Sequence, residues 1–236
     1  MLLDPAEIAA VIAADGFDRR NSDVIEPALA ARGMVDFAGF AESWNDLGVD
    51  LFMADGGRYR RRRHAVFNRT AFGLKRQPHR AHFQSRDYNS LNGGVARWFD
   101  PVKDDIAAHP ALLAALDLSH EIFNAVSPHP LWEIELHQFR ITAAPGEEGR
   151  PTPEGMHRDG VDYVMVMLIR RENIESGVTG IADCNGASLG SFTLAQPMDA
   201  TFVDDRRVFH GVTPIVPVDP VLPAWRDVLV ATFRRG

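Results

Sequence analysis

Two histidines and one carboxylate are the residues of this chain whose types and order most clearly suggest chemistry. His157 and Asp159 alternate, so that in an extended segment both side chains point to the same face. His210 follows within a later apolar stretch. A set of two histidines and one carboxylate binds non-haem Fe(II) on one face and leaves coordination positions open for substrate and oxygen. We therefore assign His157, Asp159 and His210 as metal ligands and as catalytic residues.

An arginine, Arg226, stands at the start of the last predicted strand. A guanidinium group binds a carboxylate through two parallel hydrogen bonds, which suits an acidic co-substrate beside a metal. A 2-oxo acid would chelate iron through its keto oxygen and one carboxylate, and Arg226 would bind the far carboxylate. The chemistry expected of such a site is oxidative decarboxylation of the oxo acid, with dioxygen, coupled to oxidation of a second substrate.

Each of these residues has an ordinary explanation when it is taken alone. His157 would be a loop histidine, His210 a satisfied core histidine and Arg226 a solvated strand end. The metal site follows from their joint placement, because strand ends of an antiparallel barrel can converge at one mouth. Among the other histidines we find no second set of matching ligands, although His82 and His137 are candidates for residues that contact the metal ligands without binding the metal. These other histidines are His64, His79, His82, His109, His120, His129 and His137.

Composition places the chain among ordinary globular proteins. Its 236 residues suffice for a sizeable core, with 45% hydrophobic and 24% charged residues. The net charge of −7 argues against a nucleic-acid partner, although residues 58–63 hold five arginines broken by Tyr59. No long apolar run or signal-peptide pattern is present, so we expect a soluble cytoplasmic protein without a membrane partner. The single cysteine, Cys184, excludes an internal disulfide.

Helical patterns dominate the first half of the chain. Residues 4–16 carry signals for the start and the end of a helix, and residues 23–47 predict one or two more. Residues 104–126 form an amphipathic pattern that Pro110 splits or restarts. Short strands separated by turns follow, at residues 132–142, 161–170, 177–182, 187–194, 200–203, 208–215 and 227–234.

This order of elements predicts a mainly β protein with N-terminal helices and a barrel or jelly-roll core. No internal repeat or linker divides residues 1–236, so we expect a single domain. Within it, residues 1–130 would be a largely helical and loop portion that packs on the barrel. Residues 131–236 would form the β core with the metal site.

Alternation within two stretches predicts which side chains share a face. On one face of the strand at 132–142 lie Glu133, Glu135, His137, Phe139 and Ile141. On its other face lie Trp132, Ile134, Leu136, Gln138 and Arg140. In an extended segment at 59–67, Arg60 and Arg62 face opposite to Tyr59, Arg61 and Arg63, and one of these sets would face a cavity. Residues 78–94 are polar, as in a surface loop or a ligand-recognition segment.

Longer motifs, spread over residues 50 to 234, resemble those of a known family. They are Asp55-Gly56-Gly57-x-Tyr59-Arg60-x-Arg62-Arg63, Pro78-His79-Arg80-x-x-Phe83-Gln84-Ser85, Asn89-Ser90-x-x-Gly93-Gly94, His137-Gln138-x-Arg140-Ile141, Pro153-Glu154-Gly155-x-His157-x-Asp159-Gly160-Val161-Asp162 and Asn173-Ile174-Glu175-x-Gly177-Val178. The family is that of the bacterial Fe(II)/2-oxoglutarate dioxygenases that include L-isoleucine 4-hydroxylase.

The resemblance implies a double-stranded β-helix fold, iron bound by His157, Asp159 and His210, and 2-oxoglutarate bound by Arg226. It also implies hydroxylation of a free aliphatic L-amino acid, with some members oxidising methionine sulfur. Dioxygen would be consumed, succinate and carbon dioxide would be released, and ascorbate would support turnover. We assign Gln138 and Arg140, which stand in one of the motifs, to co-substrate binding as well.

The substrate is less firmly implied, because the chain departs from the isoleucine enzyme's pattern in two places. His64-Ala65-Val66 and Leu91-Asn92 stand where other residue types are usual, and either change reshapes a side-chain pocket. A free amino acid needs partners for its carboxylate and its ammonium group. The candidates for these two roles are Arg60, Arg62 or Arg63 for the carboxylate, and Glu154 or Asp162 for the ammonium.

Three other functions fit the same residues. The same iron chemistry could act on a peptide or another small metabolite, which an open cavity mouth would favour. A non-catalytic β-barrel could bind a ligand beside a vestigial metal. A zinc hydrolase could use the same three ligands, but it would need a general base and no acidic co-substrate. A homo-oligomer is compatible with the sequence.

Overall fold

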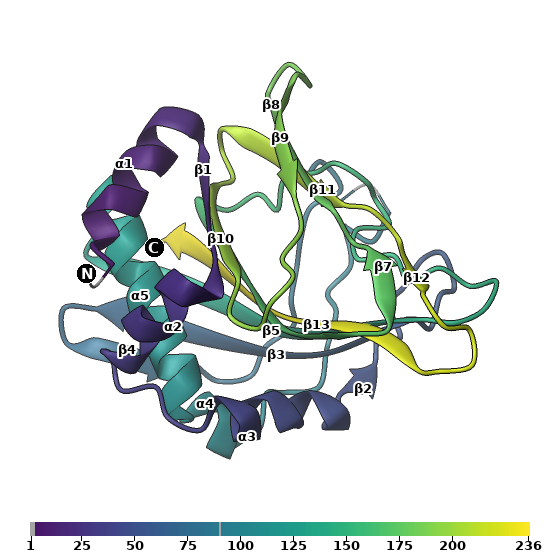
Figure 1. Ribbon diagram of the computed structural model, residues 1–236. Helices are drawn as coiled ribbons and strands as arrows, with labels where there is room; N and C mark the ends of the chain where they lie inside the picture. The colour runs from purple at the N-terminus through teal and green to yellow at the C-terminus, as the bar shows by residue number, and fades with distance from the viewer. Residues whose placement is uncertain (1–2, 90) are drawn as a thin grey trace.

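The computed structural model describes residues 3–89 and 91–236, and it is organised around one large antiparallel sheet (Figure 1). The strand order in this large sheet is β1-β10-β6-β13-β5-β3-β2, and β4 pairs with the outer part of β3. Its strands are β1 Phe17–Arg20, β2 Gly48–Val49, β3 Arg60–Thr70, β4 Gly73–Arg76, β5 Leu131–Ala143, β6 Tyr163–Glu172, β10 Ala200–Asp204 and β13 Ala224–Arg235.

Five short strands form two smaller sheets on the other side of the molecule from the helices (Figure 1). We call the β11-β8-β9 sheet the small sheet; β12 and β7 pair separately. Their bounds are β7 Ile174–Ser176, β8 Thr179–Asp183, β9 Ser188–Phe192, β11 Val208–Val212 and β12 Ile215–Pro217. The turn after Asp183 joins β8 to β9, as its sequence predicts. The prediction of a mainly β jelly-roll core with N-terminal helices is confirmed.

The helices cover one face of the large sheet (Figure 1). They are α1 Pro5–Asp15, α2 Ser22–Ala30, α3 Phe37–Glu42, the 3-10 helix η1 Ser43–Asp46, α4 Asp104–Ala107 and α5 Pro110–Val126. Asp4 caps α1 by accepting a hydrogen bond from the Ala6 N–H, and Gly16 ends it in the left-handed conformation with φ 85°. Pro110 restarts the helix after the end of α4, because proline fits the first turn but not the interior.

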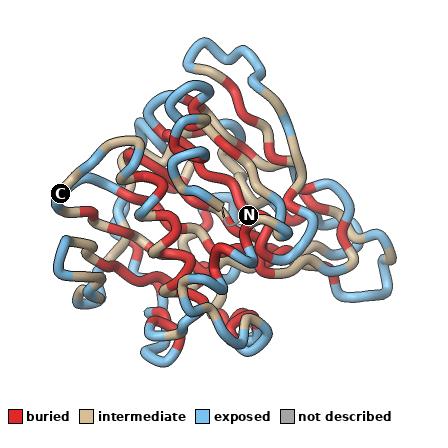
Figure 2. The backbone as a smooth tube through the Cα atoms, turned by 60° about the vertical axis from the view of Figure 1, so that its left-hand side comes forward, coloured by how far each residue is buried: buried red, intermediate tan, exposed pale blue. Residues whose placement is uncertain are grey.

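The main core lies between these helices and the large sheet. Trp132, Ile134 and Leu136 alternate along β5 and are fully buried there, as the two-residue period predicts. On the helix side, Phe123 of α5 stacks on Tyr163 of β6, with ring centroids 4.8 Å apart. Burying each such side chain contributes about 1.5–3 kcal/mol to stability. Figure 2 shows the buried positions following the strands and the inner sides of the helices, while exposed positions lie mainly in the turns.

The large sheet does not begin at residue 131. Strand β3 pairs with β5 from Arg60 to Thr70, so a segment of the predicted helical and loop portion contributes a long strand to the sheet. Strand β1 also pairs with β10 at the opposite edge. Sequence patterns near residue 130 therefore mark a change in local structure rather than a boundary between two layers.

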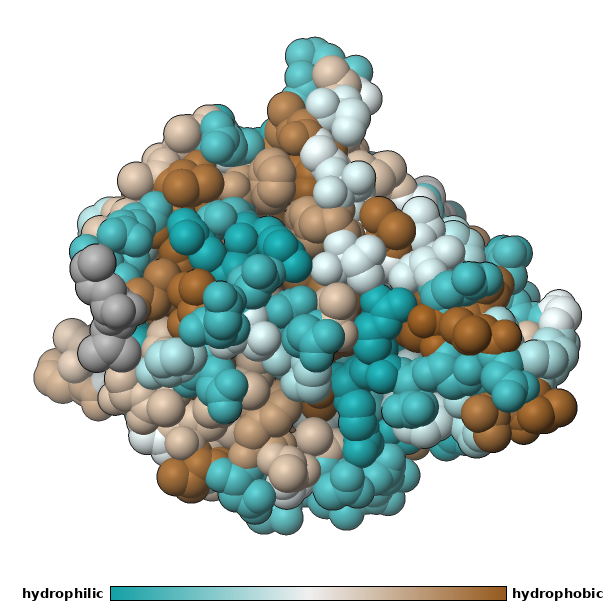
Figure 3. All heavy atoms as spheres, viewed as in Figure 1, coloured by the Kyte–Doolittle hydropathy of each residue, from teal (hydrophilic) through white to brown (hydrophobic). Residues whose placement is uncertain are grey.

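The outer surface is chemically mixed (Figure 3). Hydrophobic residues gather over the connection between β12 and β13, where Val218, Val221 and Leu222 are exposed. Within residues 3–89 and 91–236, no helix has the length and apolar character needed to cross a membrane.

Candidate active site

A cavity lies between the second face of the large sheet and the small sheet. Its apolar lining comes from alternate residues of neighbouring strands, including Val164 and Val166 of β6 and Val228 and Val230 of β13. Ile181 of β8 closes the cavity from the small sheet.

His157, Asp159 and His210 come together at the cavity, as their spacing predicts. His157 and His210 face each other across an isolated antiparallel bridge, exchanging two N–H to carbonyl hydrogen bonds of 2.9 Å. The Oδ1 atom of Asp159 lies 3.7 Å from His157 Nε2, and its Oδ2 atom lies 3.4 Å from His210 Nε2. One donor atom from each residue lies within 4.8 Å of the others, so the cluster can hold one metal ion.

Burial and mutual charge set the protonation of this metal cluster. Burial opposes a charge on His157, but the nearby carboxylate of Asp159 raises its pKa to about 9. Burial lowers the pKa of His210 to about 4, so this imidazole is neutral. Burial opposes the charge of Asp159 too, yet the two histidines hold the pKa of this carboxyl well below its usual range. A cation bound here would replace the proton on His157, because a metal ligand must be deprotonated.

The loop that carries Asp159 is fixed by residues the sequence did not single out for this role. Asp205 accepts hydrogen bonds from the backbone N–H groups of Asp159 and Gly160, both at 2.8 Å, and of Val161 at 3.1 Å. Burial and the charge of Asp159 raise the pKa of Asp205 to about 7. Gln84 donates from Nε2 to the carbonyl of Asp159 at 3.0 Å and to its Oδ1 at 3.3 Å. Such contacts behind a ligand fix its orientation.

Arg226 reaches the cavity from β13 and is only 2% exposed. Its Nε and Nη2 atoms are buried and have no hydrogen-bond partner among the described residues. Burial, with a further contribution from Arg171, lowers the pKa of Arg226 to about 10. A buried guanidinium without an acceptor is costly, so the position calls for an anionic ligand. The metal cluster and Arg226 together therefore fit Fe(II) and a dicarboxylate oxo acid.

Arg60 and Arg62 also line the cavity, whereas Arg61 and Arg63 face outward. The two inward side chains share the buried carboxylate of Asp50, with Arg60 Nε 2.8 Å and Arg62 Nη1 3.7 Å from its Oδ2. The predicted two-residue alternation of this segment is therefore confirmed, with the inward set facing the cavity.

A second cluster of histidines disagrees with the sequence analysis, which found no further set of matching ligands. The Oε2 atom of Glu135 lies 2.5 Å from His82 Nδ1 and 3.4 Å from His64 Nε2. His137 completes the group, within the distance range that a metal ion would need. The group forms because His64 pairs with His137 across β3 and β5, and a loop carries His82 over them.

We call this cluster and its neighbouring arginines the arginine–histidine wall. Its members are Arg62, His64, His82, Arg97, Glu135 and His137. All of them except His64 line the cavity, and His64 lies behind them, fully buried.

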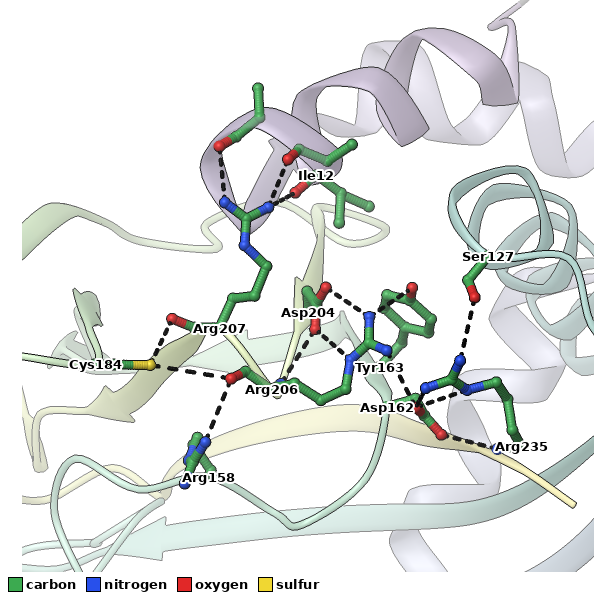
Figure 4. Close-up of polar contacts among 12 residues, drawn as sticks. Ile12, Ser127, Arg158, Asp162, Tyr163, Cys184, Asp204, Arg206, Arg207 and Arg235 are labelled. Atoms are coloured by element: carbon green, nitrogen blue, oxygen red, sulfur yellow. Dashed lines mark hydrogen bonds and ion pairs between the residues drawn. The ribbon is translucent and has the colours of Figure 1, made fainter.

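Four candidate residues do not line the cavity. Gln138 donates to Ser43 Oγ at 2.9 Å, and Arg140 pairs with Asp227 at 2.7 Å. Both share the β5 face of Trp132, which packs on the helices, so co-substrate contact does not follow from the geometry. The other two are Arg63, paired with Asp46, and Asp162, which binds Arg235 at 2.6 Å and lies 3.5 Å from Arg206 (Figure 4).

Glu154 does reach the cavity. Its Oε1 atom lies 3.6 Å from His157 Nε2, and its Oε2 atom is buried with no hydrogen-bond partner among the residues described. The carboxylate of Glu154 therefore stands beside the metal cluster rather than in the arginine–histidine wall.

Comparison with known proteins agrees with this geometry. The model of the 2OG-Fe dioxygenase family matches residues 41–232. The chain belongs to this family. The dioxygenase is 28% identical to L-isoleucine-4-hydroxylase of Bacillus thuringiensis over 156 residues, a match that spans 64% of either protein. The match therefore covers less than two thirds of the length of that relative.

Two solved structures resemble the dioxygenase along its whole length. The crystal structure of a bsmA homolog from Methylobium petroleophilum PM1 is 38% identical, covers 100% of this chain and 95% of its own, and has a TM-score of 0.90. The structure of IDO from Bacillus thuringiensis, at 19% identity, covers 99% of this chain and 100% of its own with a TM-score of 0.81. The second likeness concerns the fold alone.

Proposed function

We propose that this 2-oxoglutarate-dependent non-haem iron dioxygenase hydroxylates a free aliphatic L-amino acid. His157, Asp159 and His210 would hold Fe(II), and Arg226 would bind the far carboxylate of 2-oxoglutarate. With these groups bound, dioxygen is consumed, 2-oxoglutarate is converted to succinate and carbon dioxide, and one oxygen atom enters a C–H bond of the amino acid. Ascorbate would act as a supporting reductant.

One observation carries the proposal. A buried arginine with two unpartnered nitrogen atoms opens into the same cavity as a cluster of two histidines and one carboxylate. A zinc hydrolase using these ligands has no need for that arginine, whereas a dicarboxylate oxo acid bound to iron requires a cationic partner for the carboxylate at its far end.

The lining supports an aliphatic substrate. Valine and isoleucine side chains from both sheets surround the metal cluster, so a hydrocarbon group can approach it while water is excluded. Excluding water protects the reacting carbon from side reactions. The match to L-isoleucine-4-hydroxylase of Bacillus thuringiensis supports a free amino acid in particular.

A screen by mass spectrometry tests the proposal. Purified protein would be incubated with Fe(II), ascorbate, 2-oxoglutarate and each of the free L-amino acids in air. We expect one or more aliphatic amino acids, or methionine, to gain one oxygen atom while succinate is released. If no amino acid gains oxygen, while peptides or other metabolites do, the substrate class is wrong although the iron chemistry stands.

A further inference from the structure

Buried guanidinium groups gather at the arginine–histidine wall. Those of Arg62 and Arg97, with that of the neighbouring Arg60, are buried near the carboxylates of Asp50 and Glu135. The histidines add no charge, because burial lowers the pKa values of His64, His82 and His137. Two more carboxylates reach the cavity: Glu133 pairs with Arg80 at 2.7 Å, and Glu154 lies 3.6 Å from His157. Three buried guanidinium groups side by side are suited to an anionic ligand.

Arg62 is held rigidly with part of its donor edge free. Its guanidinium lies between two aromatic rings, 3.6 Å from the centroid of Phe99 and 4.4 Å from that of Phe139. Nη2 donates to His137 Nδ1 at 2.7 Å, while Nε is buried and has no partner in the part of the chain that the structure describes. A planar donor fixed in this way is suited to a carboxylate, because little rotational freedom is lost on binding.

The backbone places Arg97 next to His82. The two residues exchange two N–H to carbonyl hydrogen bonds of 2.9 Å across an isolated antiparallel bridge, so their side chains lie on the same side. The guanidinium group of Arg97 lies 5.7 Å from the centroid of the Phe99 ring that Arg62 also contacts. The Nε atom of Arg97 is also buried and has no hydrogen-bond partner within residues 3–89 and 91–236. Both arginines therefore present unused donors on one wall of the cavity.

Glu135 supplies the opposite charge nearby. His82 and His64 both approach its Oε2 atom, whereas its Oε1 atom has a single long contact of 3.5 Å from Arg80 Nη2. Burial opposes the charge, yet these two histidines hold the pKa of this carboxyl well below its usual range. Glu135 therefore remains an anion with one oxygen atom available to a cationic group.

We propose that the arginine–histidine wall binds the charged groups of the amino-acid substrate, its carboxylate at Arg62 and Arg97 and its ammonium group at Glu135. This inference rests on the proposed function and adds to it the residues that recognise the common part of every α-amino acid. The amino acid's side chain then extends over the valine-lined part of the cavity toward the metal cluster. A second metal ion is the competing occupant, and the direct His82–Glu135 hydrogen bond disfavours it.

The test compares each accepted amino acid with its amide, which keeps the ammonium group but lacks the carboxylate. We expect the wild-type protein to prefer the acid by about 100-fold in kcat/KM, as for a charge-assisted pair in a buried site. Arg97→Met and Arg62→Met should each remove most of this preference. Arg61→Met is the matched control, since Arg61 is a neighbour of Arg62 in β3 but is exposed.

The ammonium group is tested with a different pair of ligands. The 2-hydroxy acid with the same side chain keeps the carboxylate but lacks the ammonium group. Glu135→Gln should weaken the preference for the amino acid over this hydroxy acid and should retain the preference for acid over amide. Arg97→Met should show the reverse pattern. Dissociation constants measured by calorimetry without oxygen, with Fe(II) and 2-oxoglutarate bound, should change in parallel, which separates binding from turnover.

The outcomes separate this inference from the proposed function. If amino acids are oxidised but both arginine variants keep the acid-to-amide preference, the wall assignment is overturned while the function stands. If neither acids nor amides are oxidised or bound by the wild-type protein, both fall. A variant that fails to bind 2-oxoglutarate is misfolded, and the remaining arginine variant then decides. Two metal ions per wild-type chain, with one lost in His64→Ala, would also overturn the assignment.

Discussion

Two clusters of histidine and carboxylate face the same cavity, and they differ in how their atoms are spaced. In the metal cluster, the histidine nitrogen atoms lie 3.4 and 3.7 Å from the oxygen atoms of Asp159, too far for strong hydrogen bonds. In the arginine–histidine wall, Glu135 and His82 are in direct contact at 2.5 Å. The wider spacing in the metal cluster leaves room for a cation among its ligand atoms. In the arginine–histidine wall, Glu135 and His82 already bind each other, and they form a rigid surface.

Arg62 and Arg226 both line the cavity, but they differ in their partners. Arg62 has Asp50, His137 and two aromatic rings around it, so part of its charge is compensated before a ligand binds. Arg226 has no acidic partner among the described residues. The stability of the ligand-free protein should therefore depend on Asp50, the acidic partner of Arg62. The affinity for the co-substrate should depend on Arg226.

The largest effect is expected from removing a metal ligand. His157→Ala or His210→Ala should reduce 2-oxoglutarate turnover by at least about 1000-fold, because two remaining ligands do not hold Fe(II) in a defined geometry. Iron content, measured on the same samples, should fall from one atom per chain to near zero. His120→Ala, on helix α5, is the control and should retain both iron and activity. Retention of iron by the ligand variants would contradict the assignment of the metal cluster.

Removing the carboxylate of Asp50, which Arg60 and Arg62 share, should have the largest effect on folding. Asp50→Asn leaves Arg60 and Arg62 uncompensated, and we expect the free energy of unfolding to fall by about 3 kcal/mol. The measurement is urea-induced unfolding of the ligand-free protein. Asp46→Asn is the control, because this carboxylate is largely exposed and its loss should cost no more than about 1 kcal/mol. Equal effects of the two substitutions would show that Asp50 does not compensate buried charge.

Substitution of Arg226 is expected to weaken ligand binding without lowering the stability of the ligand-free protein, in contrast to substitution of Asp50. Arg226→Met should weaken 2-oxoglutarate binding by about 100-fold, while the free energy of unfolding of the ligand-free protein stays unchanged or rises. Calorimetric titration with 2-oxoglutarate measures the first effect and urea unfolding the second. Arg140→Lys serves as the control, since Arg140 pairs with Asp227 outside the cavity and should leave the affinity unchanged. Loss of affinity in Arg140→Lys alone would restore the sequence-based assignment of Arg140.

The smallest expected effect is a pH dependence of stability that originates in the wall. Burial lowers the pKa of His82 to about 4, so an unfolded chain takes up a proton below the usual histidine pKa while the folded chain does not. Stability therefore falls as the pH is lowered from 6.5 toward 4, by up to about 1.4 kcal/mol per pH unit for one such histidine. Above about pH 5.5 the slope reports histidines, because unfolded glutamate, whose usual pKa is 4.5, is largely ionised there.

His82→Gln should reduce this slope, which urea unfolding at pH 6.5, 5.5 and 4.5 would measure. An unchanged slope in the variant would mean that His82 is not held neutral by the fold.

The sequence reveals most about features that depend on local alternation. The period of two places Arg60 and Arg62 on one face of β3, and His157 and Asp159 on one side of their segment. The same period already puts Gln138 on the core face of β5, which argues against its assignment to the co-substrate.

The wall could not be predicted because it depends on pairing between distant segments. The meeting of His64 with His137 requires the register of β3 against β5, and that of His82 with Glu135 requires the path of the loop before residue 100. Asp205 was missed for the same reason, since a carboxylate in a tight turn carries no local sign that it binds another loop. Hydrophobic patterns in the sequence indicate which face of a strand each residue lies on, whereas contacts between polar side chains depend on tertiary structure.

The proposed reaction requires that one cavity hold an iron-bound oxo acid next to the amino acid. The most direct test is the ratio of succinate formed to hydroxylated amino acid formed, measured on one sample of the wild-type protein with Fe(II) and 2-oxoglutarate in air. We predict a ratio near one, and a marked drop in succinate formation when the amino acid is omitted. Succinate formed at the same rate with and without every amino acid, with no hydroxylated product, would contradict the claim.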